Sequence, residues 1–291
     1  MFLPTIAVAD ERVLDCKESV LVVVESPDVF QGSPREQTLA TVTYPPIGYV
    51  SGILGSDHVM TSTKNAAGAR VIVELTLTGE VVHEYPHPLG AFPYTFSPDG
   101  RKFLYSGIHS DIHGKWILRD LVTSTEDILF DPEKTEHHAH LAHPAFSPDG
   151  NTIAFSHITY TERGYDVKLC LVTVPHVFNP DDCLESEGVF PSFSPDGSKL
   201  AYWELTKQQP DSAWNLVIKE TSAIHQSPAK RVATKTFQGA DRSLWVGPIG
   251  WSPDSQWILW SEKDDPFGPY YQLFRKHIEG NEAYRIELKR P

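Results

Sequence analysis

The sequence predicts an all-β fold, a six-bladed β-propeller built from four-stranded antiparallel blades. The pentapeptide Phe-Ser-Pro-Asp-Gly begins at positions 96, 146 and 193, and a divergent copy, Trp-Ser-Pro-Asp-Ser, begins at 251. The starts are therefore 50, 47 and 58 residues apart, a period typical of propellers and other repeat proteins. Strand-forming sequence flanks each copy, and the chain of 291 residues holds close to six such units.

The repeated motif has the composition of a tight turn between two strands. Proline presets φ at one turn position, serine and aspartate bond nearby backbone groups, and glycine accepts the left-handed conformation. The aromatic residue at the head of each motif, such as Phe96, is expected to be buried against the neighbouring blade. The motif aspartates recur at one turn position, so we interpret them as structural: Asp99, Asp149, Asp196 and Asp254.

The remaining strands follow each motif in a regular order. A second strand comes directly after the turn, a third follows a variable loop, and a shorter fourth strand ends the blade. The third strands are predicted at 115–121, 165–172, 213–219 and 270–277, and fourth strands at 125–130 and 283–288.

The whole chain, residues 1–291, is predicted to form a single propeller domain. Residues 1–44 lack the motif, and we interpret them as a degenerate first blade; alternatively, residues 3–8 complete the last blade and close the ring. The further blades are predicted at 45–90, 91–135, 136–187, 188–240 and 241–291.

Several features together resemble the TolB-like propeller repeat. They are the motif itself, the alternating second strand, a third strand that ends near Asp120-Leu121 and a Thr-Gly-Glu turn at 78–80. The resemblance covers residues 90–288 and implies six or seven blades. It also implies a location in the bacterial periplasm if a signal peptide was removed. As given, the chain has no basic segment before its apolar start, which predicts a soluble, cytoplasmic protein.

Charge and cysteine content limit the classes of partner. With 25 basic and 38 acidic residues the formal net charge is −13, so the chain is expected to repel nucleic acid and anionic lipid. No apolar run is long enough for membrane insertion. The three cysteines, Cys16, Cys170 and Cys183, are odd in number and lack CxxC spacing, which argues against a disulfide framework and a structural zinc site. Cys170 is interpreted as a small core residue.

The predicted topology places the uniform turns on one face of the disc and the long irregular loops on the other, where binding residues concentrate. Eight of the 13 histidines are expected on this loop face. One hypothesis is a divalent metal at the channel mouth, with ligands among His109, His140, His143 and His157. The alternative, which we favour, is that the loop histidines are solvated and His143 bonds backbone groups at the start of a strand.

The stretch 143–149, His-Pro-Ala-Phe-Ser-Pro-Asp, is similar to a metal-binding segment of the oligogalacturonate lyases, which are TolB-like propellers. This resemblance implies metal-dependent chemistry on an oligosaccharide.

The loop face is also expected to carry aromatic and charged residues suited to a protein or peptide partner, or to a sugar. These partner residues are Arg242, Trp245, Phe267, Tyr270 and Tyr271. Trp203 and Trp214 belong either to this group or to the core.

The sequence lacks the GxSxG, glycine-rich phosphate-loop and HExxH motifs. We therefore predict a binding scaffold that engages a protein or peptide through its loop face, and no firm cofactor. The alternatives are a metal-dependent oligosaccharide lyase or hydrolase, and an architectural subunit of a larger assembly.

Overall fold

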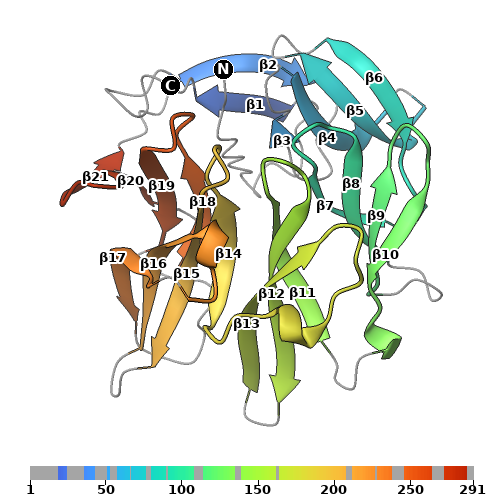
Figure 1. Cartoon of the computed structure of the whole chain (residues 1–291). Helices are drawn as coiled ribbons and strands as arrows, with labels where there is room; N and C mark the ends of the chain where they lie inside the picture. The colour runs from blue at the N-terminus through green and yellow to red at the C-terminus, as the bar shows by residue number, and fades with distance from the viewer. Residues whose placement is uncertain are drawn as a thin grey trace. The chain divides into compact units, whose positions relative to one another are not determined.

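The computed structural model describes the backbone at residues 19–24, 36–42, 51–52, 58–65, 67–76, 80–89, 91–107, 114–134, 139–161, 164–207, 212–226, 228–237, 246–263 and 272–286. In these segments the regular structure consists of β-strands and three short 3₁₀ turns, with no α-helix (Figure 1). The turns are η1 (Pro132–Lys134), η2 (Pro180–Asp182) and η3 (Thr221–Ala223). The all-β prediction therefore holds throughout the described part of the chain.

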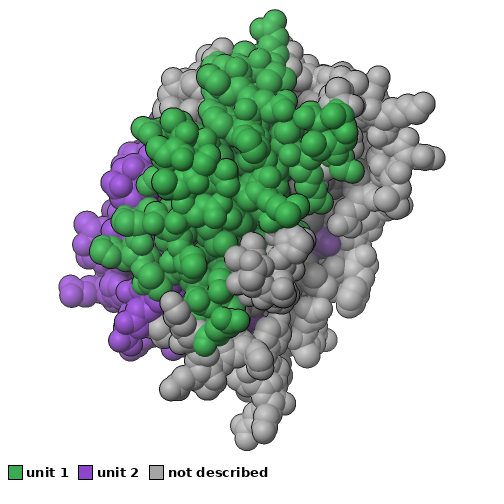
Figure 2. Space-filling model, turned by 90° about the vertical axis from the view of Figure 1, so that its right-hand side faces the viewer, with its two compact units in different colours: residues 1–135, 174–177 green, residues 136–173, 178–291 purple. Residues whose placement is uncertain are grey.

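The chain divides into two compact units, coloured separately in Figure 2. Unit 1 comprises residues 1–135 and 174–177, and unit 2 comprises residues 136–173 and 178–291. The single-domain organisation expected from the sequence stays a prediction.

Unit 1 contains three antiparallel sheets, each with its strands in chain order. A two-stranded sheet pairs β1 (Ser19–Val24) with β2 (Glu36–Val42). One four-stranded sheet is formed by β3 (Ser51–Gly52), β4 (His58–Lys64), β5 (Arg70–Thr76) and β6 (Val81–Pro86). The other is formed by β7 (Ala91–Phe96), β8 (Lys102–Gly107), β9 (Trp116–Asp120) and β10 (Glu126–Phe130).

Unit 2 contains three further antiparallel sheets. A three-stranded sheet is formed by β11 (Ala139–Phe146), β12 (Thr152–Thr161) and β13 (Gly164–Thr173). The first four-stranded sheet is formed by β14 (Gly188–Phe193), β15 (Lys199–Lys207), β16 (Ser212–Glu220) and β17 (Lys230–Phe237). The second is formed by β18 (Val246–Trp251), β19 (Trp257–Glu262), β20 (Gln272–His277) and β21 (Ala283–Ile286).

The described residues form five blades, so the predicted count of six is wrong. Four blades have four strands and one, β11–β13, has three. The predicted first blade, residues 1–44, contributes the two-stranded hairpin β1–β2. Dividing chain length by the motif period overestimated the count, because residues 1–44 contribute two described strands, whereas each blade has three or four.

The position of a fourth strand in the β11–β13 blade is taken partly by the segment after η2. The backbone N–H of Leu184 donates to the carbonyl of Leu169 at 2.7 Å, and the N–H of Leu169 donates to the carbonyl of Ser186 at 3.4 Å. Cys183 faces Cys170 of β13 in an isolated antiparallel bridge. A short irregular segment thus covers the middle of the outer strand.

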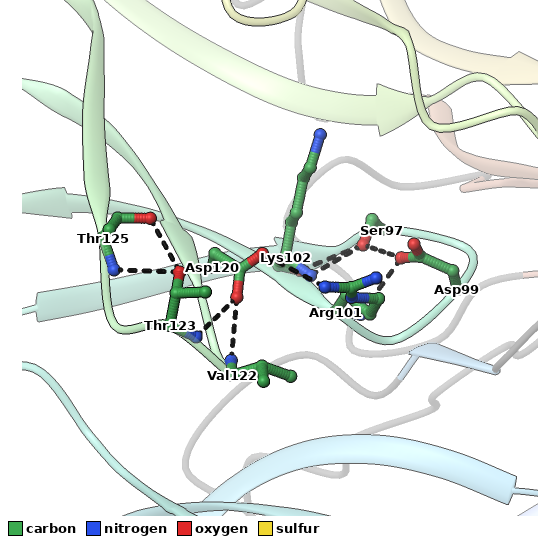
Figure 3. A network of polar contacts seen from close by, with 8 residues as sticks. All are labelled: Ser97, Asp99, Arg101, Lys102, Asp120, Val122, Thr123 and Thr125. Atoms are coloured by element: carbon green, nitrogen blue, oxygen red, sulfur yellow. Dashed lines mark hydrogen bonds and ion pairs between the residues drawn. The ribbon is translucent and has the colours of Figure 1, made fainter.

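The motif turns are closed by the same hydrogen bonds in four blades. In the first copy, the hydroxyl of Ser97 donates to the Asp99 carboxylate at 2.5 Å and accepts the backbone N–H of Lys102 at 2.8 Å (Figure 3). The same carboxylate accepts the N–H of Arg101 at 3.0 Å. Equivalent bonds recur in the other three turns. The motif aspartates are therefore turn residues, as their repetition indicates.

Tryptophans join the two four-stranded blades of unit 2. The indole N–H of Trp203 in β15 donates to the carbonyl of Gly247 in β18, and that of Trp251 in β18 donates to the carbonyl of Ser192 in β14, each at 3.1 Å. Trp203 and Trp214 are fully buried in the largest hydrophobic cluster of the described residues, which also includes Trp251. Trp203 and Trp214 are thus core residues, the second of the two roles left open by the sequence.

Candidate functional site

The predicted partner surface consists of five residues outside the described part of the chain: Arg242, Trp245, Phe267, Tyr270 and Tyr271. Their segments, 238–245 and 264–271, adjoin the described strands β18, β19 and β20. Strand β18 begins directly after the first segment, β19 ends just before the second segment, and β20 begins directly after it. These strand ends are the ones that lie away from the turn at 252–255. The partner surface stays a prediction.

Of the four histidines predicted as metal ligands, two are described with their side chains. His109 lies outside the described residues, and for His140 only the backbone in β11 is described. His143 of β11 and His157 of β12 belong to the same blade. The surroundings of these two residues decide whether they converge on one ion.

His143 lies at a bulge in β11 and has a left-handed backbone, with φ of 54°. Such a conformation is uncommon for a residue with a Cβ, and Phe190 adopts it at the corresponding bulge of β14, with φ of 53°. The Nδ1 atom lies 3.2 Å from the hydroxyl of Ser156, and the ring packs against Phe190 with centroids 3.9 Å apart. The imidazole is thus held by a polar contact and an aromatic contact.

His157 lies on the opposite face of the same sheet. Successive side chains of a strand point to opposite faces, so His157 points away from Ser156 and from the His143 ring beside it. Its ring lies 5.2 Å from that of Phe178. Burial, followed by the positive charge of Lys168, lowers the pKa of the His157 imidazole. The two described histidines therefore do not converge on a common metal position.

The cysteines require a correction, because Cys170 and Cys183 form a disulfide. The sequence-based interpretation treated Cys170 as an unpaired core residue. Cys170 is buried in β13, but the hydrogen bonds of Leu169 bring residue 183 directly opposite it. An odd number of cysteines excludes only the pairing of all of them. The sequence signal for this pair was the spacing of 13 residues between the two cysteines, across a loop.

A second group of titratable side chains lies on the β3–β6 sheet. One oxygen of the Glu74 carboxylate is 2.6 Å from Nδ1 of His58, and the other is 2.9 Å from Nδ1 of His83. The three residues come from adjacent strands, and the register places Glu74 opposite His83. Only the strand register reveals this group, because the residues are far apart in the sequence.

Two apolar side chains that the sequence-based interpretation did not single out are exposed at the start of β7. Leu89 is 85% exposed and Phe92 is 52% exposed. The Phe92 ring meets Tyr94 edge to face, with centroids 5.7 Å apart, and Tyr94 packs on buried Trp116. Because β7 ends at a motif turn, these residues lie at the other, loop end of their blade. Their signal in the sequence is an apolar crossing segment next to Pro88.

No family model matches this chain, and no curated protein sequence matches it. Solved structures do match. TolB from Acinetobacter baumannii is 14% identical with a TM-score of 0.50, over 89% of this chain and 57% of that one. A putative TolB from Agrobacterium tumefaciens is 11% identical with a TM-score of 0.53, over 87% and 84%. An oligogalacturonate lyase in complex with manganese is 11% identical with a TM-score of 0.46, over 82% and 77%.

The chain spans little more than half of the Acinetobacter TolB, 57% of its length. Within the described residues, no helix is long and apolar enough to cross a membrane. At such low identity the likeness to the two TolB structures shows the fold alone. Together with the described sheets, it identifies this chain as an all-β propeller with four-stranded antiparallel blades.

Proposed function

We propose that this protein is a TolB-like propeller scaffold that binds a protein or peptide at the loop ends of its blades. Two features of the described blades support the proposal. The motif turns use their serine and aspartate side chains to bond their own backbone, so those polar groups are already engaged. The loop end of the β7–β10 blade carries two exposed apolar side chains, Leu89 and Phe92.

The exposed pair Leu89 and Phe92 is the observation that carries the proposal. A largely exposed leucine beside a half-exposed phenylalanine offers apolar area that a partner can bury. The edge-to-face contact with Tyr94, which itself packs on Trp116, restricts the Phe92 ring before binding. A restricted aromatic side chain at a loop end has the properties of an interface anchor.

The same proposal assigns partner contacts in the β18–β21 blade to the five predicted residues, Arg242, Trp245, Phe267, Tyr270 and Tyr271. Aromatic and arginine side chains are enriched among residues that dominate binding energy.

The test is to select binding peptides from a random library displayed on phage and to measure their affinity by fluorescence polarisation. Phe92→Ala, Trp245→Ala, Phe267→Ala and Tyr271→Ala are compared with the unaltered protein. We expect at least one substitution to weaken binding about tenfold or more, because anchor residues each contribute roughly 1–2 kcal/mol or more.

Val122→Ala is the matched control, because Val122 is 65% exposed but lies at the turn end of the β7–β10 blade. It should leave the affinity unchanged. If all four loop-end variants bind as tightly as the unaltered protein, or if Val122→Ala weakens binding equally, the proposal is wrong.

The second candidate function is a metal-dependent lyase or hydrolase acting on an oligosaccharide. The half-buried imidazole of His143, held beside the Ser156 hydroxyl, favours it, because imidazole is a common ligand of divalent transition metals. Its centre would draw on His143 with His140 and His109, whereas His157 faces the other side of the sheet. Elemental analysis of untagged, oxidised protein should then find about one divalent ion, lost in His143→Ala. Protein without such an ion, whose melting temperature is unaffected by a chelator, would end this candidate.

A further inference from the structure

A cluster with the composition of a metal site lies within unit 2, apart from His143. Its members are His157 of β12, Cys170 of β13 and Cys183 of the segment after η2. One ring nitrogen of His157 and the two sulfur atoms all lie within 4.8 Å of one another. Cys170 is fully buried, and His157 and Cys183 are half-buried.

The strand register explains why the three residues meet. Cys170 lies directly opposite Phe155, and His157 is two residues further along β12, so both side chains belong to the same face of the sheet. Cys183 lies opposite Cys170 on the other side of β13. Three neighbouring chain segments thus each contribute one potential ligand.

The ring of His157 is held by an aromatic contact, and its two nitrogen atoms are not engaged by other described residues. Phe178 packs against it with ring centroids 5.2 Å apart. Among the described residues, neither ring nitrogen of His157 has a hydrogen-bond partner. A half-buried imidazole beside two sulfur atoms has the composition of a ligand set for a thiophilic metal.

We propose that His157, Cys170 and Cys183 form a redox-gated site that binds Zn²⁺ when the disulfide is reduced. The proposal goes beyond the binding function above and does not depend on it. In an oxidising compartment the two cysteines remain joined, as in this structure. In a reducing compartment the same residues hold the ion.

The gating step balances as a thiol exchange followed by metal binding. A dithiol reductant supplies two electrons and two protons, the Cys170–Cys183 bond breaks, and the reductant becomes a cyclic disulfide. Zn²⁺ then replaces the two thiol protons, because the thiolate is the ligand form.

Ligand softness selects the metal. Two thiolates and one imidazole suit a closed-shell thiophilic ion such as Zn²⁺ and do not suit Mg²⁺, Ca²⁺ or Mn²⁺, which prefer oxygen. In a tetrahedral site with bonds of about 2.0–2.3 Å, ligand atoms stand about 3.5–4 Å apart. The present spacing within 4.8 Å meets this requirement after the sulfur atoms separate. Water completes the fourth position.

The test is a titration of the full chain with Zn²⁺ against a chromophoric chelator, in the oxidised state and after reduction with a metal-free phosphine. We expect reduced protein to bind about one equivalent and oxidised protein to bind none at this site. His157→Ala and Cys183→Ser, each reduced, should bind at least about tenfold more weakly. Co²⁺ in place of Zn²⁺ should show sulfur-to-metal charge-transfer absorption that both variants lose.

Two controls isolate the site. Cys16→Ser removes the third cysteine and should leave zinc binding intact, and His143→Ala should also leave it intact, unlike an ion at the proposed lyase centre. Far-UV circular dichroism checks that the reduced protein keeps its strands. Equal zinc affinity before and after reduction, unchanged affinity in both ligand variants, loss of binding in Cys16→Ser, or unfolding on reduction would each overturn the proposal.

Discussion

The aspartate of the motif turn stabilises the fold through hydrogen bonds that lie within six consecutive residues. In the second copy, Asp149 accepts the hydroxyl of Ser147 and the backbone N–H of Asn151, and the Ser147 bond is the main cause of a lowered Asp149 pKa. The pKa of Asp254 is lowered for the same reason. Because all the partners are close in sequence, the residue types alone were sufficient to predict this role.

The lowered pKa predicts how stability depends on pH. Ionised Asp149 stabilises the folded state fully above its unfolded pKa of about 3.9, and this stabilisation is lost as pH falls through the lower folded value. Asp149→Asn should therefore reduce the free energy of unfolding at pH 7 by up to about 1 kcal/mol, since water screens this exposed carboxylate. The difference should disappear near pH 2. Urea unfolding at both pH values measures it.

Asp127→Asn serves as the control, because Asp127 is exposed on β10. It should change the free energy of unfolding by less than about 0.5 kcal/mol at pH 7. A difference between Asp149→Asn and the unaltered protein that persists at pH 2 would contradict the assignment to the ionised carboxylate.

At the scale of the element, the first strand of each motif-bearing blade is interrupted by a bulge. The register shifts within β7, β11, β14 and β18. A proline lies at or inside each shift: Pro93, Pro144, Pro191 and Pro248. Proline cannot donate a ladder hydrogen bond, so a bulge accommodates it. The bulge in β11 gives His143 its unusual backbone.

Contacts between the two four-stranded blades of unit 2 also depend on buried tryptophans. Trp203→Phe removes the indole N–H that bonds the carbonyl of Gly247 and leaves a small void in a fully buried position. The loss of one buried hydrogen bond and of packing predicts a decrease of about 2–4 kcal/mol in the free energy of unfolding. Urea unfolding followed by far-UV circular dichroism measures this change without relying on fluorescence.

Trp257→Phe provides the comparison, because Trp257 is only half-buried and contacts His277 edge to face. Its cost should be about 1 kcal/mol or less. Equal losses in the free energy of unfolding for the two substitutions would show that neither the bond to Gly247 nor the depth of burial determines the cost.

At the scale of the molecule, each of the two compact units holds hydrophobic clusters among its described residues. The largest cluster among the described residues and the disulfide belong to unit 2, and a smaller described cluster around Phe103 belongs to unit 1. Six of the seven tryptophans lie in the sequence of unit 2, and only Trp116 lies in unit 1. Tryptophan fluorescence therefore reports mainly on unit 2, whereas far-UV circular dichroism reports on both units.

These differences predict that urea unfolding is not a single transition. The fluorescence midpoint should lie at a higher urea concentration than the circular dichroism midpoint, because the larger core and the cross-link stabilise unit 2. Trp116→Phe should leave the fluorescence curve nearly unchanged. Coincident midpoints by the two probes would show instead that the units unfold together.

Sequence information was sufficient wherever the interacting groups are neighbours in the chain. The turn motif specifies its own hydrogen bonds, and the alternation around it places fourth strands such as β10 and β21 close to where they were predicted. The sequence did not yield the correct number of blades, because chain length divided by the period counts residues 1–44 as a blade, whereas their described strands form only a pair.

By itself, the sequence determined the all-β class, the order of strands in each motif-bearing blade and the structural role of the motif aspartates. Only the tertiary structure decided that Cys170 meets Cys183, that His143 and His157 point to opposite faces, and that Leu89 and Phe92 are exposed. The physical reason is distance along the chain. A turn is specified by bonds over a few residues, whereas these outcomes depend on strand register and loop path, which the packing of the whole blade sets.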